Sequence, residues 1–497
     1  MAYTTIDDGS AHFHTQTYTG NGSADRDITN DANAGDFQPD WLWIKSRSLS
    51  GNNHHLFNSN VGMPNHLSSD LNDGEQTATN KATAFNTNGF RVQTHSSVNQ
   101  SSATYVAWQW KAGGIAPTKT YKVVVVSDGG NKYRFRNSGD TATFAQSAVT
   151  LDLQEGGTYT FDLSDSSVDG HPMKFSETSN GSHGGGSVYS TGVVYQLDGS
   201  SVSESNYYNT SNFNSASSRK IIITVASSAP TLYYYCHYHS GMGGQVNTNS
   251  THGQTNFDGD ILSVSQENTT AGFSIVTYTG NGNGSDQTIG HGLGAECKVV
   301  FAKMRTDAGD SWRVFHEDVS QSGGGNLFLN GTSPLDTGDP ARIKSTNTST
   351  FTLLAYSSGY NAVNGSGKDY IAFCFSEIKG YSKIGSFKGN GNVDGTFVYT
   401  GFKPAWIMLK RTDSTNNWNI FDSKRDVDNQ VGNVLYANLS DAEEADASHS
   451  SANDFLSNGF KLRETGNAVN GSGASYIYLA FAEHPFVSSK GVPTTAR

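Results

Sequence analysis

The chain repeats one order of short motifs three times, and this repetition constrains its fold more than any other feature. Each copy opens with an aromatic residue and a Gly-Asn-Gly turn, and closes with a strand of alternating pattern. The opening motifs are Tyr18-Thr19-Gly20-Asn21-Gly22, Tyr278-Thr279-Gly280-Asn281-Gly282 and Phe387-Lys388-Gly389-Asn390-Gly391. The closing strands are predicted at 105–110, 370–375 and 476–481. Such a chain is built from copies of one structural unit.

Each closing strand places apolar residues at every second position, as Val106, Trp108 and Trp110 do. A period of two predicts a half-buried antiparallel strand. Several strands in each copy, joined by turns rich in Gly and Asn, favour a β-sandwich or jelly roll. We therefore expect an all-β chain of antiparallel sandwich modules, each burying its own interior. A short polar helix is possible only at 441–451.

The middle of the chain does not follow the repeat. A Gly- and Pro-containing linker at 111–118 precedes it, and a polar connector is predicted at 247–256. The Ser-, Asn- and Gly-rich tract 176–219 predicts long loops or short edge strands. The expected domains are repeat 1 at 1–114, an inserted sandwich at 119–266, repeat 2 at 270–379 and repeat 3 at 380–497.

The inserted segment carries a set of soft metal ligands. Cys236, His239 and Met242 recur at every third residue after a predicted strand. Thiolate, imidazole and thioether suit copper, and His171 is the best-placed second imidazole. The alternative to a metal site is that Cys236 is a small buried core residue and that Met242 fills a gap in the core. His237 is a further potential ligand, whereas His183 is predicted to be a solvated loop residue.

Residues 119–266 resemble a cupredoxin, the blue-copper β-sandwich, through the pattern Cys236-x-x-His239 with a nearby Met242 and an upstream His171. The resemblance implies that His171, Cys236 and His239 are equatorial copper ligands and that Met242 is axial. The segment departs from the family at Asp169-Gly170, where an Asn or Ser usually ties the ligand loops together. A structural clasp is favoured over electron transfer, because the segment is built into a long chain.

Composition and charge argue against several kinds of binding partner and against a membrane or disulfide-rich protein. The net charge of −12 and the scattered basic residues argue against nucleic acid and against an anionic membrane surface. The sequence has no apolar run of about 20 residues and no signal peptide, which predicts synthesis in a cytoplasm. Three cysteines cannot form a disulfide framework, and Cys297 and Cys374 are expected to be free thiols in a core.

No catalytic motif is recognisable, so the chain is not expected to be an enzyme. The carboxylate pairs Glu317-Asp318 and Glu443-Glu444 are predicted to be solvated loop charges. The histidines His14, His54 and His55 have no evident partner set. The seven tryptophans are expected in the core, with stacking on sugars as the alternative for some of them.

The repeat resembles lectin-like modules in virion proteins of marine tailed bacteriophages, notably cyanophages. The motifs that carry the resemblance are 18–22, 39–45 and 105–114. It implies a virion protein, such as a tail or head fibre, with other virion proteins as partners and cyclic homo-oligomers as a common state. Two roles compete: attachment to a host-surface glycan through loops near Trp312 or Trp418, and decoration or assembly that involves only virion partners. A copper redox protein is the third alternative.

Overall fold

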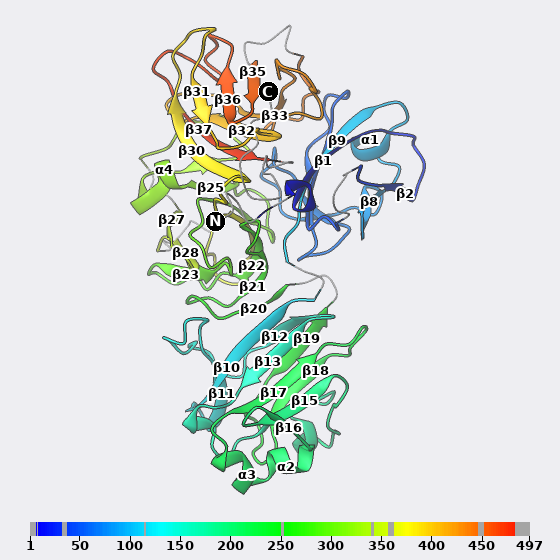
Figure 1. Cartoon of the computed structure of the whole chain (residues 1–497), viewed down its shortest axis with the longest axis vertical. Coiled ribbons are helices and arrows are strands. Elements are labelled where there is room, and N and C mark those ends of the chain that lie inside the picture. The colour runs from blue at the N-terminus through cyan, green and yellow to red at the C-terminus, as the bar shows by residue number, and fades with distance from the viewer. Residues whose placement is uncertain are drawn as a thin grey trace. The chain divides into compact units, whose positions relative to one another are not determined.

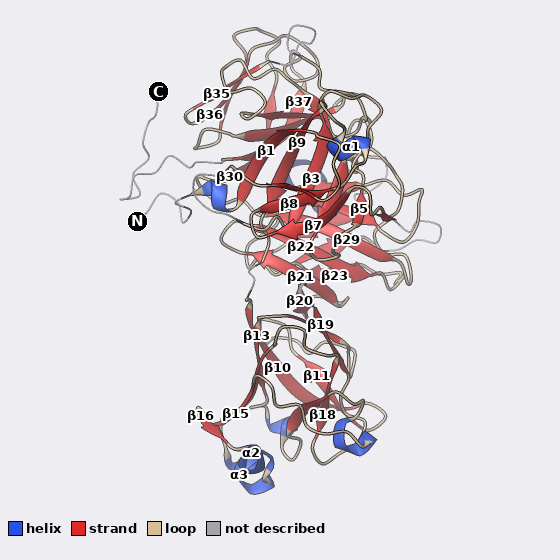
Figure 2. Ribbon diagram, turned by 90° about the vertical axis from the view of Figure 1, so that its right-hand side faces the viewer, coloured by secondary structure: helices blue, strands red, loops and turns tan. Residues whose placement is uncertain are grey.

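The computed structural model describes residues 6, 8–31, 37–113, 116–249, 253–338, 342–355, 362–445 and 452–482. Over these residues the protein consists of strands with a few short helices (Figure 2), which confirms the all-β prediction. The chain forms two compact units. One comprises residues 1–112, 267–287 and 293–497, and the other comprises 113–266 and 288–292. No helix in the described ranges has the length and apolar content that a bilayer crossing requires.

The first repeat is a sandwich of a large and a small sheet (Figure 1). The large sheet has the order β1-β9-β3-β4-β5-β6 and the small sheet the order β2-β8-β7. Their bounds are β1 (Phe13–Thr19), β2 (Arg26–Ile28), β3 (Trp41–Ser46), β4 (His55–Asn58), β5 (Asn65–Leu67), β6 (Gln76–Thr77), β7 (Ala82–Asn86), β8 (Gly89–Val92) and β9 (Thr104–Trp110). Two short helices accompany them, η1 (Gly9–Ala11) and α1 (Ser96–Asn99).

The second and third repeats keep the same strand order. In repeat 2 the large sheet contains β22 (Phe273–Thr279), β29 (Asp369–Phe375), β24 (Val299–Met304), β25 (Arg313–His316) and β26 (Leu327–Phe328), in that order. In repeat 3 the order is β30 (Ser382–Lys388), β37 (Ser475–Phe481), β32 (Trp406–Arg411), β33 (Trp418–Asp422) and β34 (Leu435–Tyr436). The smaller elements are β23 (Gln287–Gly290), β27 (Ile343–Thr346), β28 (Thr350–Leu353), α4 (Glu317–Ser320), η4 (Gln321–Gly323), β31 (Phe397–Tyr399), β35 (Asn453–Leu456) and β36 (Gly459–Leu462).

The large sheets are buried on both faces, which corrects the expectation of half-buried strands and separate interiors. In repeat 1, Leu42, Ile44 and Ala107 pack toward the small sheet. Val106 and Trp108, on the opposite face of β9, join a second core that all three repeats share. The sequence permits this because both faces of the closing strands are apolar. Each repeat therefore has an inner sandwich core and also contributes to one common core.

Three equivalent aromatic residues meet at the centre of this common core. Trp110, Phe375 and Phe481 are the last residues of β9, β29 and β37. Their ring centroids are 6.4 Å apart for Trp110 and Phe375, 5.8 Å for Trp110 and Phe481, and 5.6 Å for Phe375 and Phe481. Such a triangle of equivalent positions marks a pseudo-threefold axis, so one chain builds a closed ring of three lobes.

Equivalent hydrogen bonds link each repeat to the next one around the pseudo-threefold axis. The Trp312 indole donates to the Ser68 carbonyl of repeat 1, and the Trp418 indole donates to the Phe328 carbonyl of repeat 2. In repeat 1 the equivalent position is His54, whose Nε2 lies 2.9 Å from the Tyr436 carbonyl of repeat 3. Trp43 Nε1 donates to His54 Nδ1, which leaves the proton of His54 on Nε2.

A lysine at the equivalent position of β3, β24 and β32 also bonds to the neighbouring repeat. Lys45, Lys303 and Lys410 donate to backbone carbonyls of the neighbouring repeat, at Ser440, Asn72 and Thr332 respectively. All three lysines are buried, and burial lowers the pKa of each to about 8. The shared lysine in the sequence motif thus has a structural role between repeats.

The inserted unit is a second sandwich with its own core. One sheet has the order β11-β10-β13-β17-β15-β16 and the other the order β12-β19-β18-β14. Their bounds are β10 (Thr118–Ser127), β11 (Asn131–Phe135), β12 (Leu151–Gln154), β13 (Thr158–Asp162), β14 (Met173–Ser176), β15 (Val193–Leu197), β16 (Ser200–Val202), β17 (Arg219–Thr224), β18 (Leu232–Cys236) and β19 (Gln245–Asn249). Two further strands, β20 (Gln254–Asn256) and β21 (Ser263–Asn268), pair with each other.

The structure differs from the sequence predictions in four details, three in the inserted unit and one in repeat 3. The pairs β10–β13 and β12–β19 are parallel rather than antiparallel. The predicted connector 247–256 contains the end of β19 and all of β20. The tract 176–219 contains the short strands β15 and β16, the latter at a sheet edge as predicted, but it also holds η3 (Gly181–Gly184), α2 (Glu204–Tyr208) and α3 (Thr210–Ser215), with Tyr207 and Phe213 anchored in the core. Residues 441–445 are not helical, and the rest of the helix proposed at 441–451 lies outside the described residues.

Candidate metal centre

The fold brings two loops of the inserted unit to one end of the sheet that contains β14 and β18. Along the chain, His171 follows the short helix η2 (Ser166–Val168) and precedes β14. Cys236 is the last residue of β18 and pairs with Met173 of β14 in the antiparallel register. The backbone N–H of His237 also donates to the Pro172 carbonyl at 2.9 Å. This pairing holds the two ligand loops together without the Asn or Ser that the cupredoxin pattern has.

A glycine-rich hairpin between β18 and β19 supplies the other two predicted ligands, His239 and Met242. Gly241 adopts a left-handed φ of 74°. A Cβ on Gly243 would lie 1.7 Å from the Tyr234 carbonyl oxygen, so only glycine fits there. The hairpin therefore folds back tightly, and the thiol and the imidazole three residues later point toward one another.

Three of the four predicted ligands meet at one point. Cys236 Sγ lies 3.8 Å from His171 Nδ1 and 3.6 Å from His239 Nδ1. The three ligand atoms all lie within 4.8 Å of one another, and the two imidazole rings are 4.5 Å apart at their centroids. His171 and Cys236 are buried, whereas His239 is exposed. Met242 is 1% exposed and belongs to the same core cluster as Cys236.

Neighbouring groups orient these ligands. Tyr133 donates its hydroxyl to the His171 carbonyl at 2.7 Å, and its backbone N–H donates to the Met242 carbonyl at 3.0 Å. The Asn131 side-chain amide lies 3.3 Å from His171 Nε2. As this amide is placed, its nitrogen faces Nε2, so the Asn131 N–H donates to Nε2 of the neutral imidazole. Such outer partners fix the tautomer of a ligand histidine.

Burial favours the neutral forms of Cys236 and His171. Burial raises the pKa of the Cys236 thiol, against the backbone N–H groups of Tyr238 and His239. Burial also lowers the pKa of His171, and the neighbouring His239 adds to that effect. A metal ion that binds here therefore displaces the thiol proton and meets an imidazole that is already neutral.

The other two histidines of this region lie outside the cluster. His237 stacks on Tyr208, with ring centroids 4.0 Å apart and an interplanar angle of 17°. His183 was predicted to be a solvated loop residue; its Nε2 lies 3.1 Å from the Cys236 carbonyl oxygen, so it supports the backbone of the ligand. Among the described residues, the cluster of His171, Cys236 and His239 is the one group of three potential ligands close enough to hold a metal ion.

The other residues considered as candidate functional groups form ion pairs or are packed in the core. Glu443 is not a solvated charge: it forms ion pairs with Arg47 and Arg425. Glu317 pairs with Lys298. Cys297 and Cys374 are buried free thiols, as predicted. All seven tryptophans are buried, so core packing is confirmed, and burial in this structure excludes the stacking of sugars on Trp312 or Trp418.

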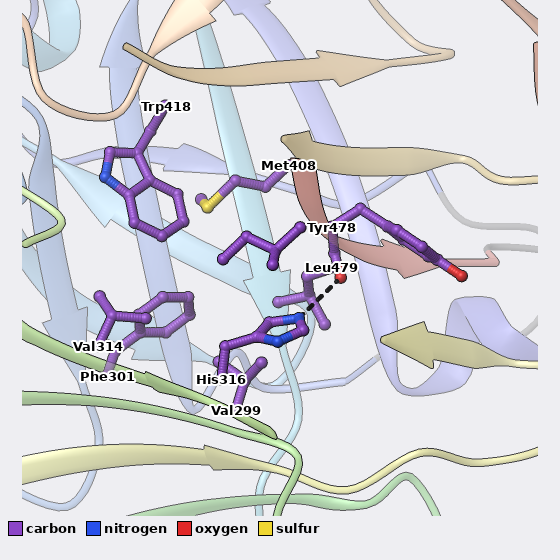
Figure 3. A pocket seen from close by; sticks show the side chains of 9 residues that line it. Val299, Phe301, Val314, His316, Met408, Trp418, Tyr478 and Leu479 are labelled. Atoms are coloured by element: carbon purple, nitrogen blue, oxygen red, sulfur yellow. Dashed lines mark hydrogen bonds between the residues drawn. The ribbon is translucent and has the colours of Figure 1, made fainter. Parts of the chain in front are cut away.

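An apolar cavity lies between repeats 2 and 3 (Figure 3). It is lined by Val299, Phe301, Val314, His316, Met408, Trp418, Ile477, Tyr478 and Leu479. His316 Nε2 faces the Tyr478 carbonyl at 3.5 Å, and burial lowers the pKa of His316 to about 4. The cavity measures about 10 Å³ to a water-sized sphere, which leaves no room for a ligand.

Comparison with protein families distinguishes the middle of the inserted unit from the rest of the chain. A family model described as a domain of unknown function (DUF7483) matches residues 8–131 and 247–485. The chain belongs to this family. The DUF7483 match spans the three repeats and omits 132–246, which contains all four predicted copper ligands. No curated protein and no solved structure matches the chain. The metal centre is therefore a feature of the insertion, and membership of the DUF7483 family says nothing about it.

Proposed function

We propose that the inserted sandwich of this protein binds one copper ion through Cys236, His171 and His239, with Met242 as a weaker fourth ligand. The meeting of one thiol and two imidazole Nδ1 atoms within 4.8 Å of one another is the observation that carries this proposal. A site of two His and one Cys with a nearby thioether suits copper better than the hard cations, which prefer oxygen ligands.

The copper has a structural role in this proposal. A bound ion joins the loop of His171 to the hairpin of His239, and both would otherwise depend on a few hydrogen bonds. Binding to the folded state alone stabilises a domain by an amount that grows with ligand concentration. Electron transfer remains the alternative, and the exposure of His239 is the observation that favours it. Reversible electrochemistry with no change in the melting temperature of the domain would favour that alternative.

Equilibrium dialysis of the full chain against Cu²⁺ tests the site. The wild type is expected to retain one copper per chain in the presence of a competing chelator. Cys236→Ser should abolish this retention, whereas His237→Ala, which changes the histidine next to the thiol but outside the cluster, should keep it. Equal retention by wild type and Cys236→Ser would contradict the proposal.

For the whole chain, we propose a non-enzymatic structural protein of a tailed-phage particle, displayed as a tail or head fibre that attaches to the host surface. The resemblance of the repeats to phage virion modules supports this role. The three-lobed ring supports it as well, because a closed body with a common core is a rigid support for a binding surface carried by one of its repeats. Decoration or assembly with virion proteins alone is the competing role.

Imaging of labelled protein in intact particles tests the location. The proposal predicts a fixed position on the tail or head, and protein found only in the lysate would contradict it. Attachment and decoration are separated by adsorption of particles that lack the protein. Attachment predicts loss of adsorption to host cells, and decoration predicts normal adsorption with less stable particles.

A further inference from the structure

We propose that an exposed aromatic surface on repeat 3 binds a saccharide. This aromatic surface consists of Val393, Phe397 and Tyr399, whose exposed fractions are 60%, 43% and 58%. The inference deepens the attachment role proposed above and rests on that role for its biological meaning. It moves the expected glycan contact away from the buried Trp312 and Trp418 to the outer sheet of repeat 3.

Phe397 and Tyr399 of the aromatic surface lie on the edge strand β31 of the sheet β31-β36-β35, and Val393 lies in the bend that precedes this strand. Val398 between the two rings is buried in the sandwich core. Because alternate residues of a strand face opposite sides, Phe397 and Tyr399 share the outer face. The Phe397 ring lies over Gly459, where a Cβ would come within 3.0 Å of two ring carbons. The Phe397 ring therefore packs flat against the sheet, and we call the exposed rings of Phe397 and Tyr399 the platform.

The fold does not require aromatic residues at these positions. The opening motif and the buried residue that follows it align Val398 with Ile28 of repeat 1 and Ile289 of repeat 2. Phe397 and Tyr399 then correspond to Asp27 and Thr29 in repeat 1, and to Thr288 and Gly290 in repeat 2. Two sandwiches of the same construction thus form with polar or small residues there. An exposed aromatic pair that the fold does not need indicates a binding surface.

Charged groups border the platform. Lys461 pairs in register with Phe397 and forms an ion pair with Asp394. Arg463 forms an ion pair with Asp454 at 2.8 Å. A saccharide presents an apolar C–H face that packs on aromatic rings and hydroxyls at its rim that bond to such charged groups. Rings in the middle and hydrogen-bonding groups at the edge match that arrangement.

The size of the surface favours a saccharide over a protein partner. The three side chains expose roughly 300 Å² of largely apolar area, taking full aromatic side chains as about 150–250 Å² each. A stable protein interface needs about 800 Å² from each partner. One or two sugar rings fit the smaller area, and their weak single-site affinity is raised when many copies act together.

Binding of the full chain to an array of bacterial surface polysaccharides and neutral oligosaccharides tests the inference. The double variant Phe397→Asp with Tyr399→Thr installs the residues that repeat 1 carries, so it is expected to fold. We expect the wild type to bind at least one saccharide, and the double variant to bind it at least tenfold more weakly. Val427→Ala, at the other strongly exposed apolar position of this repeat, is the matched control and should bind normally.

Two results would overturn the inference: no saccharide bound by the wild type at millimolar concentration, or binding by the double variant within twofold of the wild type. Loss of a virion protein partner by the double variant, with saccharide binding unchanged, would also overturn it and would assign the surface to assembly. Saccharide binding that depends on Phe397 and Tyr399 in a protein absent from the particle would support this inference while contradicting the proposed virion role.

Discussion

Trp312 donates its indole N–H to the carbonyl of Ser68 at 2.9 Å and so links repeat 2 to repeat 1. The equivalent donors Trp418 and His54 link repeat 3 to repeat 2 and repeat 1 to repeat 3. Because each repeat bonds to the next in the same way, the three interfaces close a ring. The ring and its common core predict that the three repeats unfold together.

The first prediction concerns Trp418→Phe. The substitution removes the donor to the Phe328 carbonyl and should lower the free energy of unfolding by about 1–3 kcal/mol. All seven tryptophans lie in the unit that holds the repeats, so tryptophan fluorescence during urea unfolding reports on that unit alone. We expect one transition, shifted as a whole. Val427→Ala should leave it within about 0.5 kcal/mol, and a shift of only one of several separate transitions would show that the repeats unfold independently.

The second prediction compares two equivalent glutamates. Among the described residues, Glu75 forms an ion pair with Arg305 alone, whereas Glu443 pairs with Arg47 and with the fully buried Arg425. Glu443→Gln removes one of the two carboxylates that face the buried Arg425 guanidinium, the other being Asp422, and should cost about 2–4 kcal/mol of unfolding free energy. Glu75→Gln breaks one pair whose side chains are 18% and 21% exposed, leaves no fully buried charge without its partner, and should cost about 1 kcal/mol or less. Denaturant midpoints measure both, and equal losses would argue against a special role for the buried network.

The third prediction uses the cavity between repeats 2 and 3. Val314 lines it, and the equivalent residue of repeat 3 is Ile420. Val314→Ile adds one methylene group to the void and should raise the unfolding free energy by about 0.5–1 kcal/mol. The reverse change, Ile420→Val, should lower it by about 1 kcal/mol. Destabilisation by Val314→Ile would mean that the void cannot accept the added group.

The fourth prediction concerns acid. Burial, together with Lys81 Nζ at 2.9 Å from Nε2, lowers the pKa of His66 to about 4. The unfolded chain, with a histidine pKa of about 6.5, therefore binds a proton between pH 6.5 and 4 that the folded chain does not. Stability should fall as the pH falls through this window, by up to about 3 kcal/mol for this group.

His66→Asn, which installs the residue found at the equivalent position of repeat 2, should flatten this pH dependence by up to one proton. His54, His55 and His316 have depressed pKa values of the same origin, so part of the dependence should remain. Unfolding free energies measured from pH 7 to pH 4.5 compare the two proteins. An unchanged slope in His66→Asn would contradict the assignment to this imidazole.

Much of the fold could be predicted from local patterns. The opening motifs and the alternating closing strands identified three related sandwiches, because turn chemistry and side-chain periodicity are local properties. The common core could not be found in this way. The signal was present, since β9 carries apolar residues such as Tyr105 and Ala107 on the face opposite Trp108. Strands that are apolar on both faces indicate burial on both faces, and only long-range packing decides what covers them.

For the metal centre, ligand type and spacing predicted the residues that the fold brings together. The spacing of Cys236 and His239 is local, so one hairpin fixes it. His171 lies 65 residues upstream of Cys236, and the β14–β18 register that aligns it is a long-range pairing. Nothing near Asn131 in the sequence indicates that its amide faces His171. Outer-shell partners of this kind come from packing between strands rather than from motifs.

X-ray absorption at the copper edge of the copper-loaded full chain tests the metal site most directly. The account predicts one thiolate sulfur and two imidazole nitrogens as the nearest neighbours of copper, with the sulfur contribution absent in Cys236→Ser. A nearest shell of oxygen and nitrogen alone in the wild type, or a thiolate that persists in Cys236→Ser, would contradict it.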